Sequence, residues 1–159
     1  MKKKLSHYDS AGRVSMVDIG PKEITRRTAT ARAFVAISHD VLRALPDNPK
    51  GDPLEVARIA GIGAAKKTSD LIPLCHQLPL THVGLEFELQ ENGIEITATA
   101  ATAARTGVEM EAMTAAAVAA LTIYDMTKAL DKAIEIRQLH LVEKTGGKSG
   151  HYRRARSAK

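Results

Sequence analysis

The sequence predicts an α+β fold of the ferredoxin-like sandwich type, with an antiparallel sheet and helices on one face. Three observations lead to this prediction: a β-hairpin signal at residues 82–100, a long helical stretch that ends at Leu130, and the element order strand, helix, helix, strand, strand, helix, strand. No internal repeat divides the 159 residues, and 44% apolar residues suffice for the core of one domain. One compact domain is therefore expected.

The first elements follow from local patterns. Small or aliphatic residues occupy every second position of residues 30–38, which predicts a strand with one apolar face. Ser38 offers an N-cap for a short helix that ends near Pro46. A second helix begins at Pro53 with Asp52 as its cap, and the broad apolar face that follows predicts that it packs on the core.

The hairpin has the clearest signal. Apolar and polar residues alternate from Val83 to Gln90, Asn92 and Gly93 are typical of a two-residue turn, and the alternation resumes at Ile94. The two strands should therefore have one face in water.

The last two elements are a helix and a strand. Strong helix formers run from Val108 or Glu109 to Leu130, and the alanines of residues 115–120 predict close packing against a sheet. Alternation over 134–142 predicts the final strand.

Composition excludes several classes of protein. Only 3% of residues are aromatic and none is Trp, which poorly supports a base-stacking surface for nucleic acid. The one cysteine cannot form an intrachain disulfide, and no apolar stretch of about 18 residues predicts a membrane span. The basic start, residues 1–4, lacks the apolar run of a signal peptide, so we expect a cytoplasmic protein.

The net charge of +5 is concentrated at both ends of the chain. Such charge attracts nucleic acids, acidic membrane surfaces or small phosphorylated molecules. Solvated tails are the simpler interpretation, because blocks of like charge are often disordered. Charge alone therefore leaves the partner open.

The segment "DLIPLCHQLPLTH", residues 70–82, places Cys75 beside His76. Neighbouring residues in an extended segment point to opposite sides, which disfavours a thiolate–imidazole couple. A zinc site would need further ligands, and the chain has no second cysteine. Because Pro73 and Pro79 stiffen the backbone, we expect a rigid loop that aims His76 into a pocket, although a structural histidine is the default for this residue type.

The long helix carries two acidic sites. Glu109 and Glu111 near its start are candidates for a functional site, but ordinary compensation of the helix dipole explains them equally well. Asp125 and Lys128 lie one turn apart, as common surface ion pairs do. Because the residues around this pair are apolar, we expect Asp125 and Lys128 to be desolvated. Desolvation raises the pKa of the carboxyl and lowers that of the ammonium, so the pair could exchange a proton near neutral pH.

A glycine-rich segment, "EKTGGKSG", follows the last strand. It lacks the first glycine of a P-loop and no helix follows, so a Walker-type nucleotide hydrolase is excluded. A glycine loop that carries Lys144 and Lys148 can still hold phosphate through backbone N–H groups and ammonium charge.

Nearly the whole chain resembles the molybdenum cofactor biosynthesis protein C family, the cyclic pyranopterin monophosphate synthases. The resemblance rests on "MVDIGPKEITRR" at 16–27, "KGDPLEVARIAGIGAAKKTSDLIPLCH" at 50–76, "TGVEMEAMTAAAVAALTIYDMTKAL" at 106–130 and "KTGGKSG" at 144–150. It implies a lyase that converts 3′,8-cyclo-7,8-dihydro-GTP into cyclic pyranopterin monophosphate with release of diphosphate. It further implies general acid–base catalysis on a small GTP-derived substrate.

The resemblance assigns roles to residues of this sequence. As catalytic residues it implies Asp125, Lys128, Lys50 and His76, and as substrate-binding residues Leu74, Cys75, His76, Glu109, Met110, Glu111 and Lys144. Two departures touch none of these positions: Gln77 replaces an expected proline, and the tail "HYRRARSAK" is specific to this chain.

The resemblance also bears on organisation and partners. We expect a flexible basic arm at residues 1–28, one catalytic α+β domain at 29–150 and a basic tail at 151–159. No metal site or cofactor is expected, although Mg²⁺ can accompany the triphosphate. The family implies a hexamer built as three dimers. Since 14 helical residues between Glu111 and Asp125 span about 21 Å, we expect sites shared between subunits.

Two other functions stay open at this point. A small basic ferredoxin-like domain can bind RNA, but the chain has only two Phe and three Tyr for such a surface. A different pterin or nucleotide cyclohydrolase would usually need a zinc-bound water, for which the ligands are lacking. We therefore expect neither a nucleic-acid partner nor a membrane partner.

Overall fold

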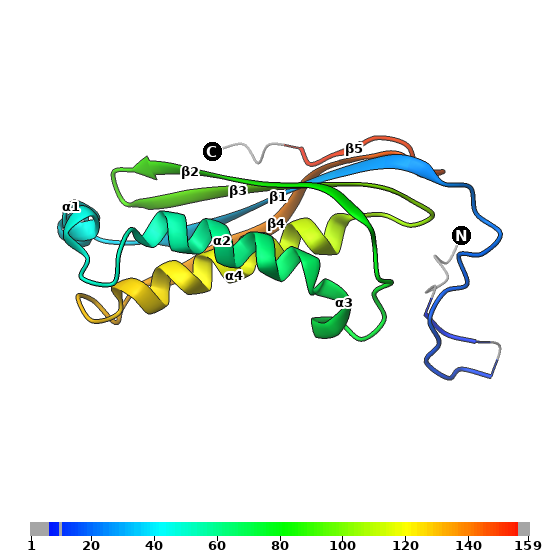
Figure 1. Cartoon of the computed structure of the whole chain (residues 1–159), viewed down its shortest axis with the longest axis horizontal. Helices are drawn as coiled ribbons and strands as arrows, with labels where there is room; N and C mark the ends of the chain where they lie inside the picture. The colour runs from blue at the N-terminus through cyan, green and yellow to red at the C-terminus, as the bar shows by residue number, and fades with distance from the viewer. Residues whose placement is uncertain (1–6, 10, 156–159) are drawn as a thin grey trace.

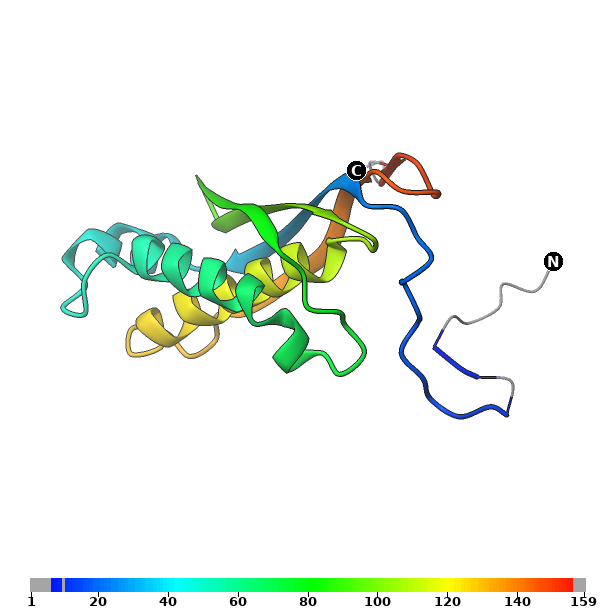
Figure 2. The same ribbon diagram turned by 45° about the vertical axis from the view of Figure 1, so that its right-hand side comes forward.

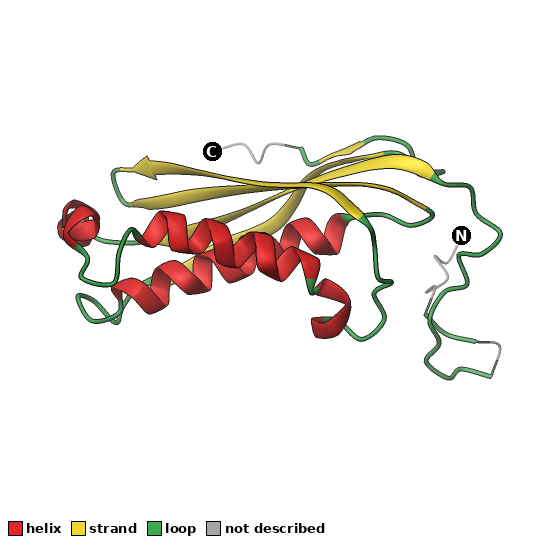
Figure 3. Cartoon of the chain, viewed as in Figure 1, coloured by secondary structure: helices red, strands yellow, loops and turns green. Residues whose placement is uncertain are grey.

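The computed structural model describes residues 7–9 and 11–155. In this part of the chain, one antiparallel sheet is covered on a single face by helices (Figure 1 and Figure 3). The elements are β1 (Thr25–Ala36), α1 (His39–Ala44), the 3₁₀ helix η1 (Leu45–Asp47), α2 (Pro53–Lys66), α3 (Thr68–Leu71), β2 (Leu80–Gln90), β3 (Gly93–Ala104), α4 (Glu109–Thr127), β4 (Glu135–Thr145) and β5 (Tyr152–Arg153).

The strand order β2-β3-β1-β4-β5 confirms the predicted fold class. β1 lies between β3 and β4, antiparallel to both, and helices α2 and α4 cross the sheet on the same side (Figure 1). This is the split βαβ arrangement of a ferredoxin-like sandwich with one short strand, β5, added at the edge beside β4.

The core consists of small and aliphatic side chains between the sheet and the two long helices. Ala115, Ala116, Ala119 and Ala120 of α4 are fully buried, as the alanine-rich centre predicts. Their small size lets the helix lie close to β1 and β3, and Ile94 and Ile96 of β3 fill the space between them.

The hairpin forms as predicted, but its glycine has another role. The loop consists of residues 91 and 92, and Gly93 is already the first residue of β3. A Cβ atom on Gly93 would lie 2.3 Å from the Val35 carbonyl oxygen and 2.5 Å from the Phe34 ring. Gly93 is therefore required by the close approach of β1, and no positive φ is involved.

Two of the strand boundaries that differ from the prediction bear on the candidate site. β1 begins at Thr25, inside the segment 1–28 that was expected to be an arm, because the polar residues before Ala29 pair with β3 on one side and, from Thr28, with β4 on the other. β4 extends to Thr145, so the last strand leads directly into the glycine loop.

Other differences concern short elements. Helix α3 was not predicted, and α4 ends at Thr127, three residues before Leu130. The two-residue strand β5 lies inside the expected tail and pairs with β4 at Glu143 and Lys144.

The N-terminal segment passes in front of the end of the sheet where α4 begins. In Figure 2 it descends on the side of the loop that follows α3. A hydrogen bond between His76 and Val17, described below, joins the two. Within the described part of the chain no helix is both long and apolar enough to cross a bilayer.

Candidate active site at the ends of helix α4

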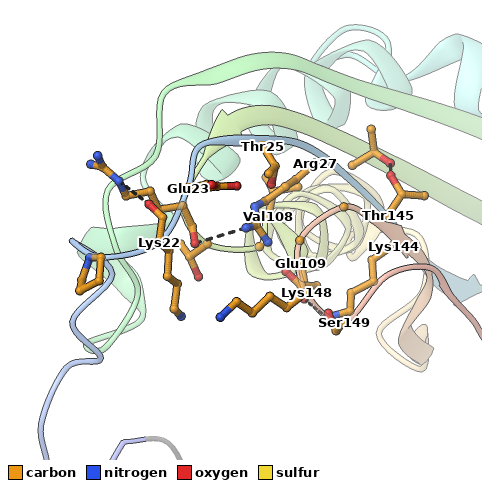
Figure 4. A pocket seen from close by; sticks show the side chains of 17 residues that line it. Lys22, Glu23, Thr25, Arg27, Val108, Glu109, Lys144, Thr145, Lys148 and Ser149 are labelled. Carbon is orange, nitrogen blue, oxygen red and sulfur yellow. Dashed lines mark hydrogen bonds and ion pairs between the residues drawn. The ribbon is translucent and has the colours of Figure 1, made fainter.

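Two cavities lie at the N-terminal end of α4, and the larger of these two, of about 800 Å³, lies where β1 begins and β4 ends (Figure 4). Its walls are the start of β1, the loop between β3 and α4, and the glycine loop after β4. Positive charge predominates, because five cationic side chains line it against two carboxylates: Lys22, Arg27, Arg105, Lys144 and Lys148 against Glu23 and Glu109. An anionic ligand is favoured here.

Lys144 is held at the wall of this cavity by an ion pair. Its Nζ lies 2.6 Å from Oε1 of Glu109, the first residue of α4, and both side chains are about three-quarters buried. Beside it, the hydroxyls of Thr28 and Thr145 share a hydrogen bond of 2.7 Å between β1 and β4. The pairing of β1 with β4 therefore fixes the position of Lys144.

The glycine loop lies directly against β1. Gly146 has φ +91° and Gly147 has φ +73°. A Cβ atom on Gly146 would come within 2.3 Å of the Arg26 carbonyl oxygen, and one on Gly147 within 2.2 Å of Arg27 Nη1. Only glycine fits at both positions, and the loop can present backbone N–H groups to a phosphate, as the sequence indicates.

The smaller cavity, of about 410 Å³, adjoins the larger one. Both are lined by Lys22, Thr106, Gly107 and Glu109. Seven of the residues that the sequence assigns to the site therefore lie at the N-terminal end of α4, in the walls of the two cavities: Leu74, Cys75, His76, Glu109, Met110, Glu111 and Lys144.

Glu111 is the most unusual group in this region. It is only 3% exposed, and its Oε2 has no hydrogen-bond partner among the described residues. Burial, followed by the charge of Glu109, raises the pKa of Glu111 to about 6. This carboxyl can therefore gain or lose a proton near neutral pH.

Cys75 lies in the same wall. Burial and the nearby Glu111 carboxylate raise the pKa of its thiol, which disfavours the thiolate that a nucleophile needs. The cysteine therefore shapes the cavity, in agreement with the argument from sequence against a Cys–His couple.

His76 lines the smaller cavity as expected, but one of its ring nitrogens is already engaged. Nε2 lies 2.8 Å from the carbonyl oxygen of Val17 in the N-terminal segment. No pattern in the sequence predicts this contact, which joins residues 59 positions apart.

Asp125, Lys128 and Lys50 gather at the opposite end of α4. Nζ of Lys128 lies 2.5 Å from Oδ1 of Asp125. Asn48 anchors the loop of Lys50 to this end, since its Nδ2 donates to the Met126 carbonyl and its Oδ1 accepts from the Lys50 N–H.

The expected desolvation of the Asp125–Lys128 pair is wrong for the single chain. The two side chains are 61% and 50% exposed. The hydrogen bond and charge of Lys128 lower the pKa of Asp125, and the same contact raises the pKa of Lys128. The apolar neighbours Ile123 and Met126 face the core instead, so both charged forms are favoured.

The structure thus divides the predicted residues into two groups. Within one chain, 14 helical residues, or about 21 Å, separate Glu111 from Asp125.

Three cationic residues of the larger cavity, Lys22, Arg27 and Arg105, were not singled out from the sequence as site residues. The excess of positive charge near the N-terminus pointed to Lys22 and Arg27 only, and no pattern in the sequence indicated Arg105.

The described residues contain no cluster of three or more His, Cys, Asp or Glu side chains that could hold a metal ion. The fold and the two cavities define a class of protein: a ferredoxin-like α+β domain with a basic cavity that favours an anionic ligand, joined to a second cavity that holds a protonatable carboxyl. The comparisons with known proteins narrow this class.

Residues 16–147 match the model of the MoaC family. A cyclic pyranopterin monophosphate synthase of Heliobacterium modesticaldum is 56% identical over 152 residues, which cover 93% of this chain and 96% of that protein. The synthase of Novosphingobium aromaticivorans is 56% identical over 153 residues, with 95% and 98% covered, and that of Chloroflexus aurantiacus is 50% identical over 157 residues, with 96% of each covered. The chain belongs to the MoaC family.

Proposed function

We propose that this protein is a cyclic pyranopterin monophosphate synthase of molybdenum cofactor biosynthesis. It would act as a lyase that converts the cyclised dihydro-GTP intermediate into cyclic pyranopterin monophosphate and diphosphate. One observation carries the proposal: a basic cavity adjoins a buried protonatable carboxyl, in a chain 56% identical to synthases of this name over almost its full length.

The larger cavity suits the triphosphate. Formation of the cyclic phosphate expels diphosphate, so negative charge grows on the leaving group in the transition state. Lys144, Lys148 and Arg27 line this cavity beside the N–H groups of Gly146 and Gly147. Cations and fixed backbone dipoles stabilise such charge without reorganisation.

The rearrangement of the base requires proton transfers to and from nitrogen and oxygen. Glu111 has a pKa of about 6 and suits transfer near neutral pH. Asp125, with Lys128 and Lys50 beside it, would supply a second acid–base group. The conversion involves no net oxidation or reduction, so the proposal needs no redox cofactor, and Mg²⁺ would enter with the triphosphate.

We further propose that two subunits share each site. If the α4 helices of two chains pack antiparallel, Glu111 of one chain approaches Asp125 of the partner subunit. The helical layer offers apolar surface for such a contact, since Ile59 of α2 is 71% exposed and Leu121 of α4 is 56% exposed. Burial by the partner would also desolvate the Asp125–Lys128 pair. A hexamer of three such dimers and a cytoplasmic location stay predictions.

Turnover of the proposed substrate is the direct test. The purified protein is incubated with the cyclised dihydro-GTP intermediate, and the pterin product and diphosphate are quantified. We expect both in equal amounts, and no diphosphate from GTP itself under the same conditions. Absence of product from a folded chain would contradict the proposal.

A further inference from the structure

The imidazole of His76 is fixed by a main-chain contact. Its Nε2 lies 2.8 Å from the carbonyl oxygen of Val17, an atom that only accepts hydrogen bonds. Nε2 must therefore carry a proton and donate it. The ring is half-buried, and the turn in which the Cys75 N–H donates to the Ile72 carbonyl holds the loop in place.

This hydrogen bond holds one end of a short segment, residues 17–22, which we call the strap. Inside the strap, the Gly20 N–H donates to Oδ1 of Asp18 and the Lys22 N–H donates to the Ile19 carbonyl, so the backbone turns tightly. At its other end, Nε of Arg105 donates to the Lys22 carbonyl at 2.8 Å. Two side chains from elsewhere in the fold thus hold the strap at its first and last residues.

The strap forms a wall that the two cavities have in common. Val17 lines the smaller cavity, whereas Lys22 lines both. In Figure 4 the Lys22 side chain reaches into the basic cavity on the side of Lys148. Lys22 is the cation that the strap itself contributes, and its position depends on the two carbonyl contacts.

A catalytic role for His76 would use a ring nitrogen against the substrate. In the structure Nε2 instead bonds to the protein itself, and its partner Val17 lies in a segment that no sequence pattern connects with the loop at 72–79. The hydrogen bond instead joins this loop to the strap, whose last residue, Lys22, lines both cavities.

We propose that His76 is a positioning residue, whose Nε2–H holds the Val17 carbonyl so that the strap closes the site and directs Lys22 to the phosphates of the substrate. The substrate assignment rests on the proposed function, whereas the hydrogen bond from His76 to the strap does not. Loss of this hydrogen bond should weaken substrate binding, because it allows Lys22 to move.

Replacement of His76 by glutamine distinguishes a positioning role from a role in proton transfer. The side-chain amide of a glutamine at this position can reach and donate as Nε2 does, but it cannot exchange a proton near neutral pH. The variants are His76→Gln, His76→Ala, Lys22→Ala and the double variant His76→Ala with Lys22→Ala. His82→Gln, at an exposed position of β2 outside both cavities, is the matched control.

The first measurement is hydrogen exchange of residues 16–24 in the substrate-free chain. Loss of one hydrogen bond of ordinary strength predicts exchange about tenfold faster in His76→Ala. His76→Gln should restore the slow exchange, and His82→Gln should leave it unchanged. This measurement needs no substrate, so it succeeds or fails independently of the proposed function.

The second measurement separates KM from kcat for the cyclised dihydro-GTP intermediate. We expect KM to rise about tenfold in His76→Ala and to return to within about threefold in His76→Gln, with kcat retained. Because His76 acts through Lys22, the effects of the two alanine substitutions on KM should not add.

Three results would overturn the proposal. Unchanged exchange in His76→Ala, or fast exchange in His76→Gln, would show that this bond does not hold the strap. Slow exchange in His76→Gln combined with a large loss of kcat would make the imidazole a catalytic acid or base. If the unsubstituted protein does not turn over the intermediate, the proposed function fails while the exchange data still decide the role of His76.

Discussion

Glu111 shows how a single side chain acquires its chemistry from its surroundings. The third residue of a helix often carries a carboxylate, since it compensates the helix dipole. Here Glu111 lies in the wall of the smaller cavity together with Leu74 and Cys75, and only 3% of the residue is exposed. The carboxyl therefore has a pKa of about 6 and suits proton transfer near neutral pH.

Replacement of Glu111 by glutamine should stabilise the protein at neutral pH. The ordinary pKa of 4.5 rises to about 6 in the folded chain, so the folded state binds this proton more tightly than the unfolded state. The stability that the proton provides is complete below pH 4.5 and is lost as the pH rises through 6. At pH 7.5 the ionised group costs about 2 kcal/mol, and Glu111→Gln removes this cost.

Thermal unfolding at two pH values measures this effect. The Tm of Glu111→Gln should exceed that of the unsubstituted chain by several degrees at pH 7.5 and equal it at pH 4. The exposed Glu91, in the β2–β3 loop, supplies the control variant Glu91→Gln. A Tm difference that does not change with pH would contradict the assigned pKa.

At the scale of elements, the fold depends on a close crossing of α2 and α4. Gly61 is buried at this crossing, where an added Cβ atom would lie 2.9 Å from the Ala115 carbonyl oxygen and 2.6 Å from Cδ2 of Leu85. Gly63 lies one half-turn further along the same helix, and an added Cβ atom would meet nothing within 4 Å. The two glycines offer opposite environments in one helix.

The same substitution should therefore have opposite effects at these two positions. Gly61→Ala forces backbone or side-chain shifts and should destabilise the protein by about 1–3 kcal/mol. Gly63→Ala reduces the entropy of the unfolded chain and should stabilise it by about 0.5–1 kcal/mol. Urea unfolding of the two variants measures both values, and equal effects would argue against the tight crossing.

At the scale of the whole molecule, the question is how two groups of residues about 21 Å apart serve one substrate. The group with Glu111 lies in the walls of cavities, whereas Asp125 and Lys128 are exposed to solvent. A second subunit that supplies one of the two groups would account for this separation. A two-fold interface between α4 helices places each end of α4 beside the opposite end of α4 in the partner subunit.

Mixing two inactive variants tests this arrangement. Asp125→Asn and Glu111→Gln chains should each lose about 10²–10⁴-fold in turnover, as the removal of a positioned acid or base typically does. After random reassociation, one site in each mixed dimer contains both intact residues, so activity should return to about a quarter of the unsubstituted level.

Native mass spectrometry shows whether mixed dimers have formed. Each variant carried alone through the same dissociation and reassociation is the control and should stay inactive. If mixed dimers are present and activity does not return, each chain must bind substrate by itself.

The sequence by itself predicted the order of the main strands and helices, although not α3 or β5, and the family resemblance assigned residues to the candidate site. Alternation at period two marked the hairpin, and the run of alanines marked the buried centre of α4, because burial on one face of a regular element repeats along the chain. Glu111, Lys144 and Asp125 are predicted site residues, since their local motifs follow the family pattern.

Tertiary structure decided the state of these groups. Burial of Glu111, exposure of Asp125 and the bond from His76 to Val17 depend on segments far apart in the sequence. Periodicity reports which face of an element is apolar, but not which distant loop covers a given side chain. Because the pKa of a carboxyl depends on that cover and on nearby charges, only the folded chain assigns the protonatable role to Glu111 and the ionised one to Asp125.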